Sequence, residues 1–228
     1  MPTEKFKAAV IGCGYIGAGK DSTHSEVGVF SHTAALLASP HTELVALGDC
    51  NSEVLNEAAM RFGVKNVFTD IKSMLAVVEP EFVSIATPDQ THADIASVVL
   101  DCPSVKLILL EKPIATNARE GANMVKKAAE KNVLLAVNFS RRYASKFQSL
   151  RSEISNGLLG KLQTVVGFYG KGILHNGSHW IDLLRLLTGE EVLKARAMHH
   201  ADPKLADPTP DVSFGLSSGL PAHLFGCD

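Results

Sequence analysis

The sequence has no long run of charge of one sign and no apolar stretch long enough to span a bilayer. Lys and Arg number 22 and Asp and Glu number 24, so the balance favours neither nucleic acid nor a membrane surface as a partner. Residues 1–7 are charged where a signal peptide would need an apolar core. These absences predict a cytoplasmic protein whose partner is a small molecule.

Cysteine is also sparse, and its spacing argues against a zinc ribbon or a disulfide framework. We expect four reduced thiols, at Cys13, Cys50, Cys102 and Cys227. Apolar residues make up 46% of the 228, enough to form the core of one large or two small domains.

Short apolar runs alternate with longer helical patterns in the first part of the chain, which is typical of βαβ units. The predicted strands are apolar on both faces, as strands covered by helices on both sides must be. They are residues 7–11, 44–47, 82–86, 106–110 and 133–137, and helical spacing occurs over 52–62, 90–100 and 117–131. The pattern predicts an α/β fold with a parallel sheet.

The pattern changes near Asn138, after which strands follow one another without intervening helices. We predict helices over 143–154 and 178–187, and strands over 162–168, 192–198, 212–216 and 222–227. The sequence therefore predicts two domains, a dinucleotide-binding domain over 1–138 and an α+β domain with an open, largely antiparallel sheet over 139–228.

A glycine pattern, G-x-G-x-x-G, directly follows the first predicted strand. Gly12 can take the positive φ of a tight turn, Gly14 lets the backbone approach a pyrophosphate, and Gly17 lets the next helix pack closely. Tyr15 and Ile16 complete the turn and count among the cofactor-binding residues. The alternative is a turn that merely ends the strand. Because the glycine pattern is followed by further alternation of strands and helices, a cofactor site is favoured over a plain turn.

Residues 18–29 are too polar and glycine-rich to continue the helix that such a turn normally opens. We expect a loop there, with a new helix starting at Ser31 as N-cap. A solvated insertion is favoured for this loop over a flap across the cofactor or substrate.

Ligands of open α/β sheets bind beyond the carboxyl ends of the strands. Asp49 ends the second strand, where a carboxylate accepts from ribose hydroxyls and repels a 2′-phosphate, so NAD is favoured over NADP. The alternative is that Asp49 caps the helix near Ser52. Thr87 and Pro88 form a rigid turn suited to a flat nicotinamide ring. His92 follows on the next helix, and we favour a structural role for it over contact with the cofactor.

Lys112 follows the apolar strand at residues 106–110, where a lysine is costly unless a polar group meets it. Its ammonium could donate to a substrate oxygen and stabilise a developing alkoxide. Glu111 would then position that ammonium.

The last polar cluster lies at residues 172–182. If Asn176 caps a helix, His179 falls on its first turn, where the helix dipole disfavours imidazolium and keeps a neutral base. Asp182 lies three residues on, along the same face. A histidine that is only hydrogen-bonded in a core is the alternative.

These motifs together resemble the glucose-fructose oxidoreductase / inositol dehydrogenase / MocA (Gfo/Idh/MocA) family. The resemblance rests on the glycine turn, on residues 86–88 with His92, on Glu111-Lys112-Pro113, and on residues 177–179 with Ile181 and Asp182. It implies a Rossmann domain and NAD(P)-dependent oxidation of a sugar, cyclitol or nucleotide-sugar hydroxyl. It also implies that Lys112 and His179 form the catalytic pair.

One position departs from the resemblance: His175 stands where many of these relatives have an aspartate. His175 is therefore expected to act as an auxiliary catalytic and substrate-binding residue, together with Asn176 at the substrate. Arg142 is either a substrate contact or part of a solvated cluster. Two rival functions remain, a dinucleotide-binding sensor without turnover and a metal enzyme using His175, His179 and Asp182.

The sequence stops directly after the strand pattern at 222–227. The resemblance implies further strands that complete the sheet and commonly build an oligomer interface. We therefore expect the second domain to be truncated, and a homo-oligomer, a dimer or tetramer, if it is complete.

Overall fold

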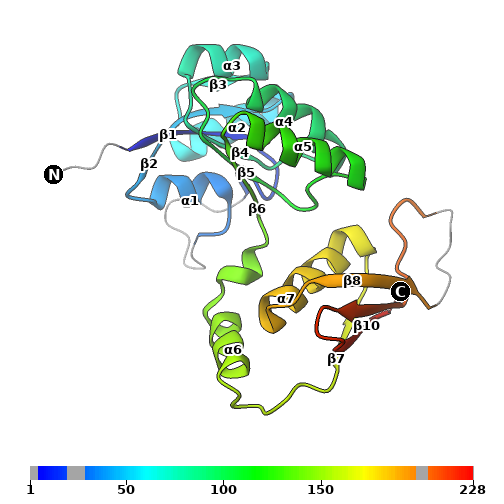
Figure 1. Cartoon of the computed structure of the whole chain (residues 1–228). Coiled ribbons are helices and arrows are strands. Elements are labelled where there is room, and N and C mark those ends of the chain that lie inside the picture. The colour runs from blue at the N-terminus through cyan, green and yellow to red at the C-terminus, as the bar shows by residue number, and fades with distance from the viewer. Residues whose placement is uncertain (1–4, 20–28, 199–204, 228) are drawn as a thin grey trace. The chain divides into compact units, whose positions relative to one another are not determined.

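The chain forms two units, Met1–Asn138 and Phe139–Asp228, in the computed structural model (Figure 1). The structure describes residues 5–19, 29–198 and 205–227. Within these ranges no helix is long and apolar enough to cross a membrane.

The first unit is built on a six-stranded, fully parallel sheet. Five strands confirm the predicted apolar runs, and the two-residue strand β3 is an addition. In the order β3-β2-β1-β4-β5-β6, they are Val67–Phe68, Thr42–Gly48, Phe6–Ile11, Phe82–Ile85, Leu107–Leu110 and Leu134–Val137.

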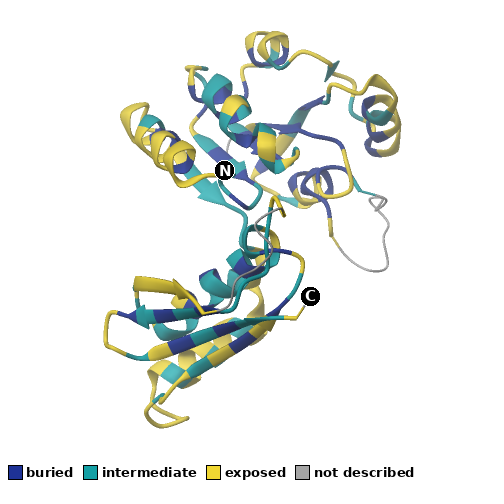
Figure 2. Ribbon diagram, turned by 90° about the vertical axis from the view of Figure 1, so that its right-hand side faces the viewer, coloured by how far each residue is buried: buried dark blue, intermediate teal, exposed yellow. Residues whose placement is uncertain are grey.

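Helices cover both faces of this sheet because alternate residues of β1 point to opposite sides. Ala8 and Val10 pack in one buried cluster with residues of α1 and α2, whereas Ala9 and Ile11 pack in another with residues of α3, α4 and α5. The strands are accordingly buried and the outer sides of the helices exposed (Figure 2). The helices are α1 (His32–Ala38), α2 (Ser52–Phe62), α3 (Ile71–Val78), α4 (His92–Leu100) and α5 (Ala118–Glu130), with a 3₁₀ turn η1 (Asp89–Thr91) before α4.

Strand register brings the carboxyl ends of five strands to one edge. Ile11 pairs with Gly48 and with Ile85, and the last residues of β4, β5 and β6 are likewise in register. The residues that follow these strands therefore lie along a single edge, and they are Gly12, Asp49, Ala86, Glu111 and Asn138.

The start of α1 is hydrogen-bonded to the glycine turn, although residues 20–28 separate the two in the sequence. His32 and Thr33 donate their N–H groups to the carbonyls of Ile16 and Gly17, at 3.1 and 2.9 Å. Ser31 caps α1 by accepting from the N–H of Ala34, which confirms the predicted helix start. Most of the loop expected over 18–29, and the flap suggested for it, lies outside the described residues.

The second unit contains a four-stranded sheet in the order β7-β10-β9-β8. Its β10–β7 pair is parallel and its other two pairs are antiparallel, so the sheet is largely antiparallel as predicted. The elements are η2 (Ser140–Tyr143), α6 (Ser145–Ser155), β7 (Val165–Tyr169), a π-helical turn η3 (Ile173–Gly177), α7 (Ser178–Thr188), β8 (Val192–Ala197), β9 (Val212–Leu216) and β10 (Pro221–Gly226).

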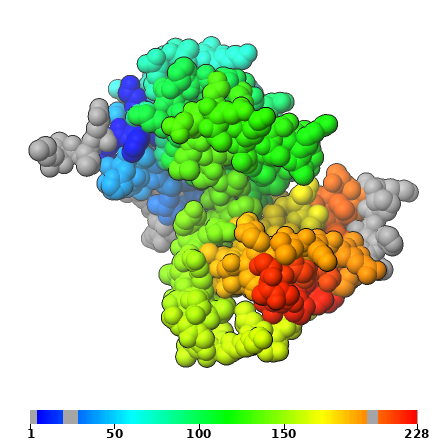
Figure 3. All heavy atoms as spheres, in the orientation of Figure 1, coloured from blue at the N-terminus to red at the C-terminus, as the bar shows by residue number. Residues whose placement is uncertain are grey.

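One face of this second sheet packs against α7, with Leu184, Phe214 and Leu224 in a shared buried cluster. The other face is open: the side chains of Val166 and Phe168 on β7 are exposed. The C-terminal strand β10, red in Figure 3, lies at the surface of this unit.

Candidate functional site

The glycine turn after β1 leaves space where a dinucleotide phosphate would pass. Gly12 has a φ of 92°, and a Cβ there would lie 2.6 Å from the carbonyl oxygen of Ala86. A Cβ at Gly17 would overlap the carbonyl oxygen of Gly12. At Gly14, by contrast, a Cβ would meet nothing within 4 Å, so the missing side chain faces open space. This shape fits close approach of a pyrophosphate to the backbone.

Asp49 ties the end of β2 to this turn. Its carboxylate accepts from the N–H of Cys13 at 2.7 Å and from the N–H of Asn51 at 2.8 Å. The side chain that caps α2 is Asn51, which accepts from Glu53 and Val54, so the alternative cap at Asp49 was wrong. Asp49 therefore stands beside the glycine turn, where its remaining lone pairs can accept from hydroxyl groups.

Cys13 is buried within the same turn, and its thiol does not face solvent. Burial, with the nearby carboxylate of Asp49 as a second cause, raises the pKa of this thiol to about 12. The thiol therefore stays protonated and acts as a small apolar group.

His92 joins two of the loops at this edge. Its side chain is buried, with Nδ1 2.8 Å from the carbonyl oxygen of Pro113 and Nε2 2.9 Å from that of Thr87. Both ring nitrogens thus face backbone carbonyl oxygens, and the side chain is buried between these two loops. These contacts favour a structural role for His92, and its inclusion among the cofactor-binding residues stays a prediction.

Glu111 is held by neighbours on two other segments. Its Oε1 accepts from Nε2 of His32 at 2.9 Å and from the side chain of Asn138 at 2.6 Å. Burial raises the pKa of this carboxyl, but hydrogen bonds from His32 and Asn138 and from the backbone N–H of Lys112 outweigh it and lower the pKa. The side chain of Glu111 is thus bonded to His32 and Asn138, and the expectation that Glu111 positions the ammonium of Lys112 stays a prediction. Lys112 itself is half-buried, directly after β5.

The helix predicted over 178–187 is confirmed as α7, but Asn176 does not cap it. α7 continues from the π-helical turn, and the residue before it, Gly177, is already helical, so Asn176 is not an N-cap. Four consecutive N–H groups, from Gly172 to His175, are accepted by the segment Asp207–Thr209. Asp207 takes those of Leu174 and His175 at 2.8 and 2.9 Å, so this distant segment acts as the cap.

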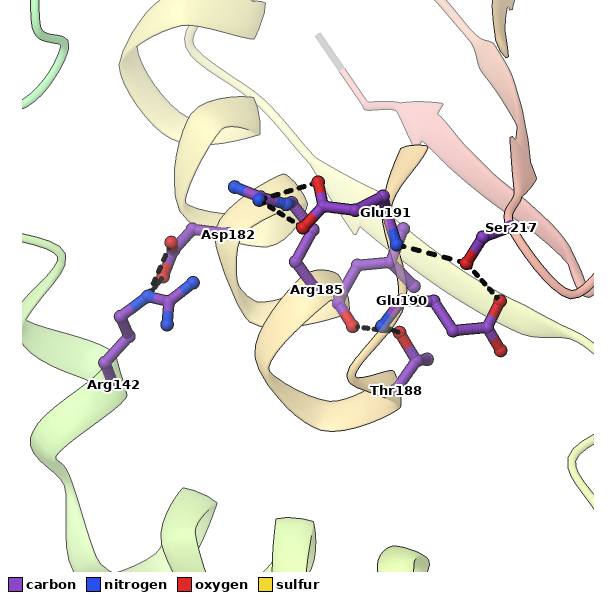
Figure 4. Close-up of polar contacts among 8 residues, drawn as sticks. Arg142, Asp182, Arg185, Thr188, Glu190, Glu191 and Ser217 are labelled. Atoms are coloured by element: carbon purple, nitrogen blue, oxygen red, sulfur yellow. Dashed lines mark hydrogen bonds and ion pairs between the residues drawn. The ribbon is translucent and has the colours of Figure 1, made fainter. Parts of the chain in front are cut away.

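His179 and Asp182 lie one turn apart on α7, and each contacts the segment after residue 138. The ring of His179 packs edge-to-face against Phe139, with centroids 6.0 Å apart. Nε of Arg142 donates to both oxygens of Asp182, at 2.7 and 2.8 Å (Figure 4). Arg142 is therefore held against α7 by Asp182, which lies one helical turn after His179.

The metal alternative does not fit this arrangement. Within the described ranges no group of three His, Cys, Asp or Glu side chains is placed to hold an ion. The carboxylate of Asp182 is instead engaged by Arg142.

The first unit has the doubly wound parallel sheet of a Rossmann domain, and comparison with known proteins identifies its family. Residues 6–139 match the family model described as an oxidoreductase family with an NAD-binding Rossmann fold. The chain belongs to this Gfo/Idh/MocA family.

Curated relatives include levoglucosan dehydrogenase of Pseudarthrobacter phenanthrenivorans, 27% identical over 82% of this chain and 52% of the relative. D-glucoside 3-dehydrogenase of Escherichia coli is 24% identical, over 87% and 58% of the two chains. Rhizopine catabolism protein MocA of Rhizobium meliloti is 30% identical, over 82% and 58%. The chain thus spans about half the length of these curated relatives.

Solved structures share the fold. GenD2 from gentamicin A biosynthesis, in complex with NAD, has a TM-score of 0.81 at 23% identity and covers 100% of this chain and 68% of its own. Apo scyllo-inositol dehydrogenase from Lactobacillus casei has a TM-score of 0.78 at 19% identity, over 100% and 70%. At these identities the likeness concerns the fold alone.

Proposed function

We propose that this chain carries out hydride transfer between NAD and a hydroxyl or carbonyl carbon of a sugar or cyclitol. The observation that carries the proposal is that the glycine turn, Asp49 and Glu111, the residue before Lys112, all lie along one edge of the sheet. This edge lies in the part of the chain that matches the family model. The names of relatives support the substrate class, since they act on levoglucosan, glucosides and inositols. The nicotinamide, when bound, supplies the acceptor or donor of the hydride.

Binding of the dinucleotide is assigned to the first unit. The open space at Gly14 would admit the pyrophosphate, with Tyr15 and Ile16 in the same turn. The carboxylate of Asp49 would accept from the ribose hydroxyls and would disfavour a 2′-phosphate, which supports NAD over NADP. Thr87 and Pro88 would border the nicotinamide ring. The ring of His92 contacts the carbonyl of Thr87 and so supports this turn.

Two side chains would handle the substrate hydroxyl. Oxidation removes a hydride from carbon and a proton from oxygen, so one group must take the proton and another must stabilise the oxygen as it becomes negative. We assign the first role to His179 and the second to the ammonium of Lys112. The family resemblance alone supports placing both residues in one reaction.

Arg142 and the residues before His179 are assigned to substrate binding. Among the described residues the side-chain bonds of Arg142 run from Nε to Asp182, which leaves its two terminal nitrogens for substrate oxygens. His175 and Asn176, in the π-helical turn, would contribute further polar contacts. A sugar or cyclitol presents several hydroxyls for such donors.

The test is turnover of a panel of inositols, glycosides, aldoses and nucleotide sugars with NAD. Lys112→Ala and His179→Ala should each lower kcat by about a hundredfold or more, with little change in NAD affinity. Lys106→Ala is the matched control for Lys112, because Lys106 is an exposed lysine directly before the same strand, paired with Glu81. NAD binding without turnover of any panel member would contradict the proposal and favour the sensor.

A further inference from the structure

His32, the first residue of α1, carries a buried imidazole that no motif of the sequence singled out. Its Nδ1 meets the hydroxyl of Ser84 on β4, and its Nε2 lies 2.9 Å from Oε1 of Glu111, directly after β5. Asn138, directly after β6, donates to the same oxygen. A single side chain of α1 thus contacts groups from neighbouring strands at the cofactor edge of the sheet.

The proton positions in this network follow from its donors and acceptors. The pKa of Glu111 is lowered although burial opposes this, so its carboxylate is ionised and can only accept. Nε2 of His32 must therefore donate to Glu111. Nδ1 can then accept from the hydroxyl of Ser84, and each polar group has a partner.

His32 is also bonded to the dinucleotide turn, through its backbone. Its N–H donates to the carbonyl of Ile16, inside the glycine turn, at 3.1 Å. The carboxylate that its side chain holds belongs to Glu111, the residue directly before Lys112 in the chain. Hydrogen bonds therefore run from the glycine turn through His32 to Glu111, and the peptide bond of Glu111 continues directly to Lys112.

We propose that His32 is a positioning residue that holds the Lys112 peptide in place through Glu111 and couples it to the dinucleotide turn. It acts through Lys112 without touching substrate or cofactor, and the proposal rests on the function assigned to Lys112 above. A lysine placed by a fixed peptide loses activity when that peptide moves, because displacement of a reacting group by about 1 Å can cost a hundredfold in rate.

Two amide substitutions separate the two bonds of the imidazole. The amide of Gln at residue 32 reaches the place of Nε2 and can still donate to Glu111. The shorter Asn reaches only the place of Nδ1, so His32→Asn keeps a polar group near Ser84 and loses the bond to Glu111. Both variants bury an amide of similar polarity, so general destabilisation should affect them alike.

His32→Asn is expected to lower kcat about tenfold or more, with KM for the substrate within about threefold, whereas His32→Gln retains most of the activity. In a Lys112→Ala background, His32→Asn should cost no further activity, because its effect runs through Lys112. Equal losses in His32→Asn and His32→Gln, or a full further loss in the Lys112→Ala background, would overturn the proposal.

Hydrogen exchange supplies a readout that needs no turnover. The peptide spanning residues 107–115 should exchange faster in His32→Asn than in wild type and stay protected in His32→Gln. Unchanged protection in His32→Asn would overturn the inference even if the chain is an active dehydrogenase. Conversely, faster exchange in a chain that turns over no substrate would sustain the link to Lys112 and count against the proposed function alone. Should His32→Asn fail to fold, Glu111→Gln probes the same bond from its other end, with the same expected loss of protection.

Discussion

Asp207 should be a main determinant of the stability of the second unit. Its carboxylate accepts from two consecutive backbone N–H groups, those of Leu174 and His175, at the start of the helical segment that carries the histidines. Loss of a capping side chain costs about 0.5–2 kcal/mol, and a hydrogen bond to a charged acceptor contributes about 1.5–3 kcal/mol. Asp207→Ala should therefore lower the free energy of unfolding of this unit by about 2–3 kcal/mol.

The chain offers its own probe for this measurement. Trp180, the single tryptophan, lies on α7 and packs against the ring of Phe214 at 5.8 Å, so its fluorescence reports unfolding of the second unit. Urea titrations followed at this residue would give the change in free energy. Asp207→Asn, which keeps an acceptor without the charge, should lose less than Asp207→Ala.

Glu191→Gln is the matched control, since its carboxylate lies 2.7 Å from Arg185 in the same unit but in an exposed pair. An exposed pair of this kind contributes less than about 1 kcal/mol. If Asp207→Ala unfolds within about 0.5 kcal/mol of wild type, or no more easily than Glu191→Gln, the assignment of Asp207 as the cap is wrong.

Three other predictions concern the first unit. Asp49→Ala should reduce the preference for NAD over NADP by about tenfold, measured as the ratio of dissociation constants, because it removes a charge that repels a 2′-phosphate; an unchanged ratio would contradict this. Cys13, with its pKa raised to about 12, should be alkylated at least about a hundredfold more slowly than the exposed Cys50 and Cys227 in peptide mass spectrometry, and equal rates would refute its burial. Folding lowers the pKa of Glu111 from its ordinary 4.5, so the stability it contributes is present above that pH and is lost as the pH falls through the lowered value. Glu111→Gln should flatten this acid loss in pH-dependent urea titrations, and an identical slope would count against it.

Local pattern was enough to predict most of this fold. The buried strands of a parallel sheet read as apolar runs, and the glycine turn, Asp49 and Lys112 follow such runs directly. Two elements were not predicted, the two-residue strand β3 and the eight-residue helix α3. Two residues are too few to show the alternation of a strand.

Contacts between distant segments account for what the sequence did not show. The helix start expected at Asn176 fails because Asp207, 32 positions beyond His175, caps the segment earlier. The role of His32 depends on Glu111, 79 positions away. Asp207 and His32 belong to none of the motifs, and only the fold reveals which backbone and side-chain groups these two residues contact.

The most direct test of the proposed function is reduction of NAD by this chain with a panel of sugars and cyclitols, comparing wild type with Lys112→Ala at matched NAD occupancy. The account predicts that wild type forms reduced nicotinamide with at least one polyol and that Lys112→Ala binds NAD with similar affinity but turns over about a hundredfold or more slowly. Tight NAD binding by wild type with no reduction on any panel member, or full turnover by Lys112→Ala, would contradict it.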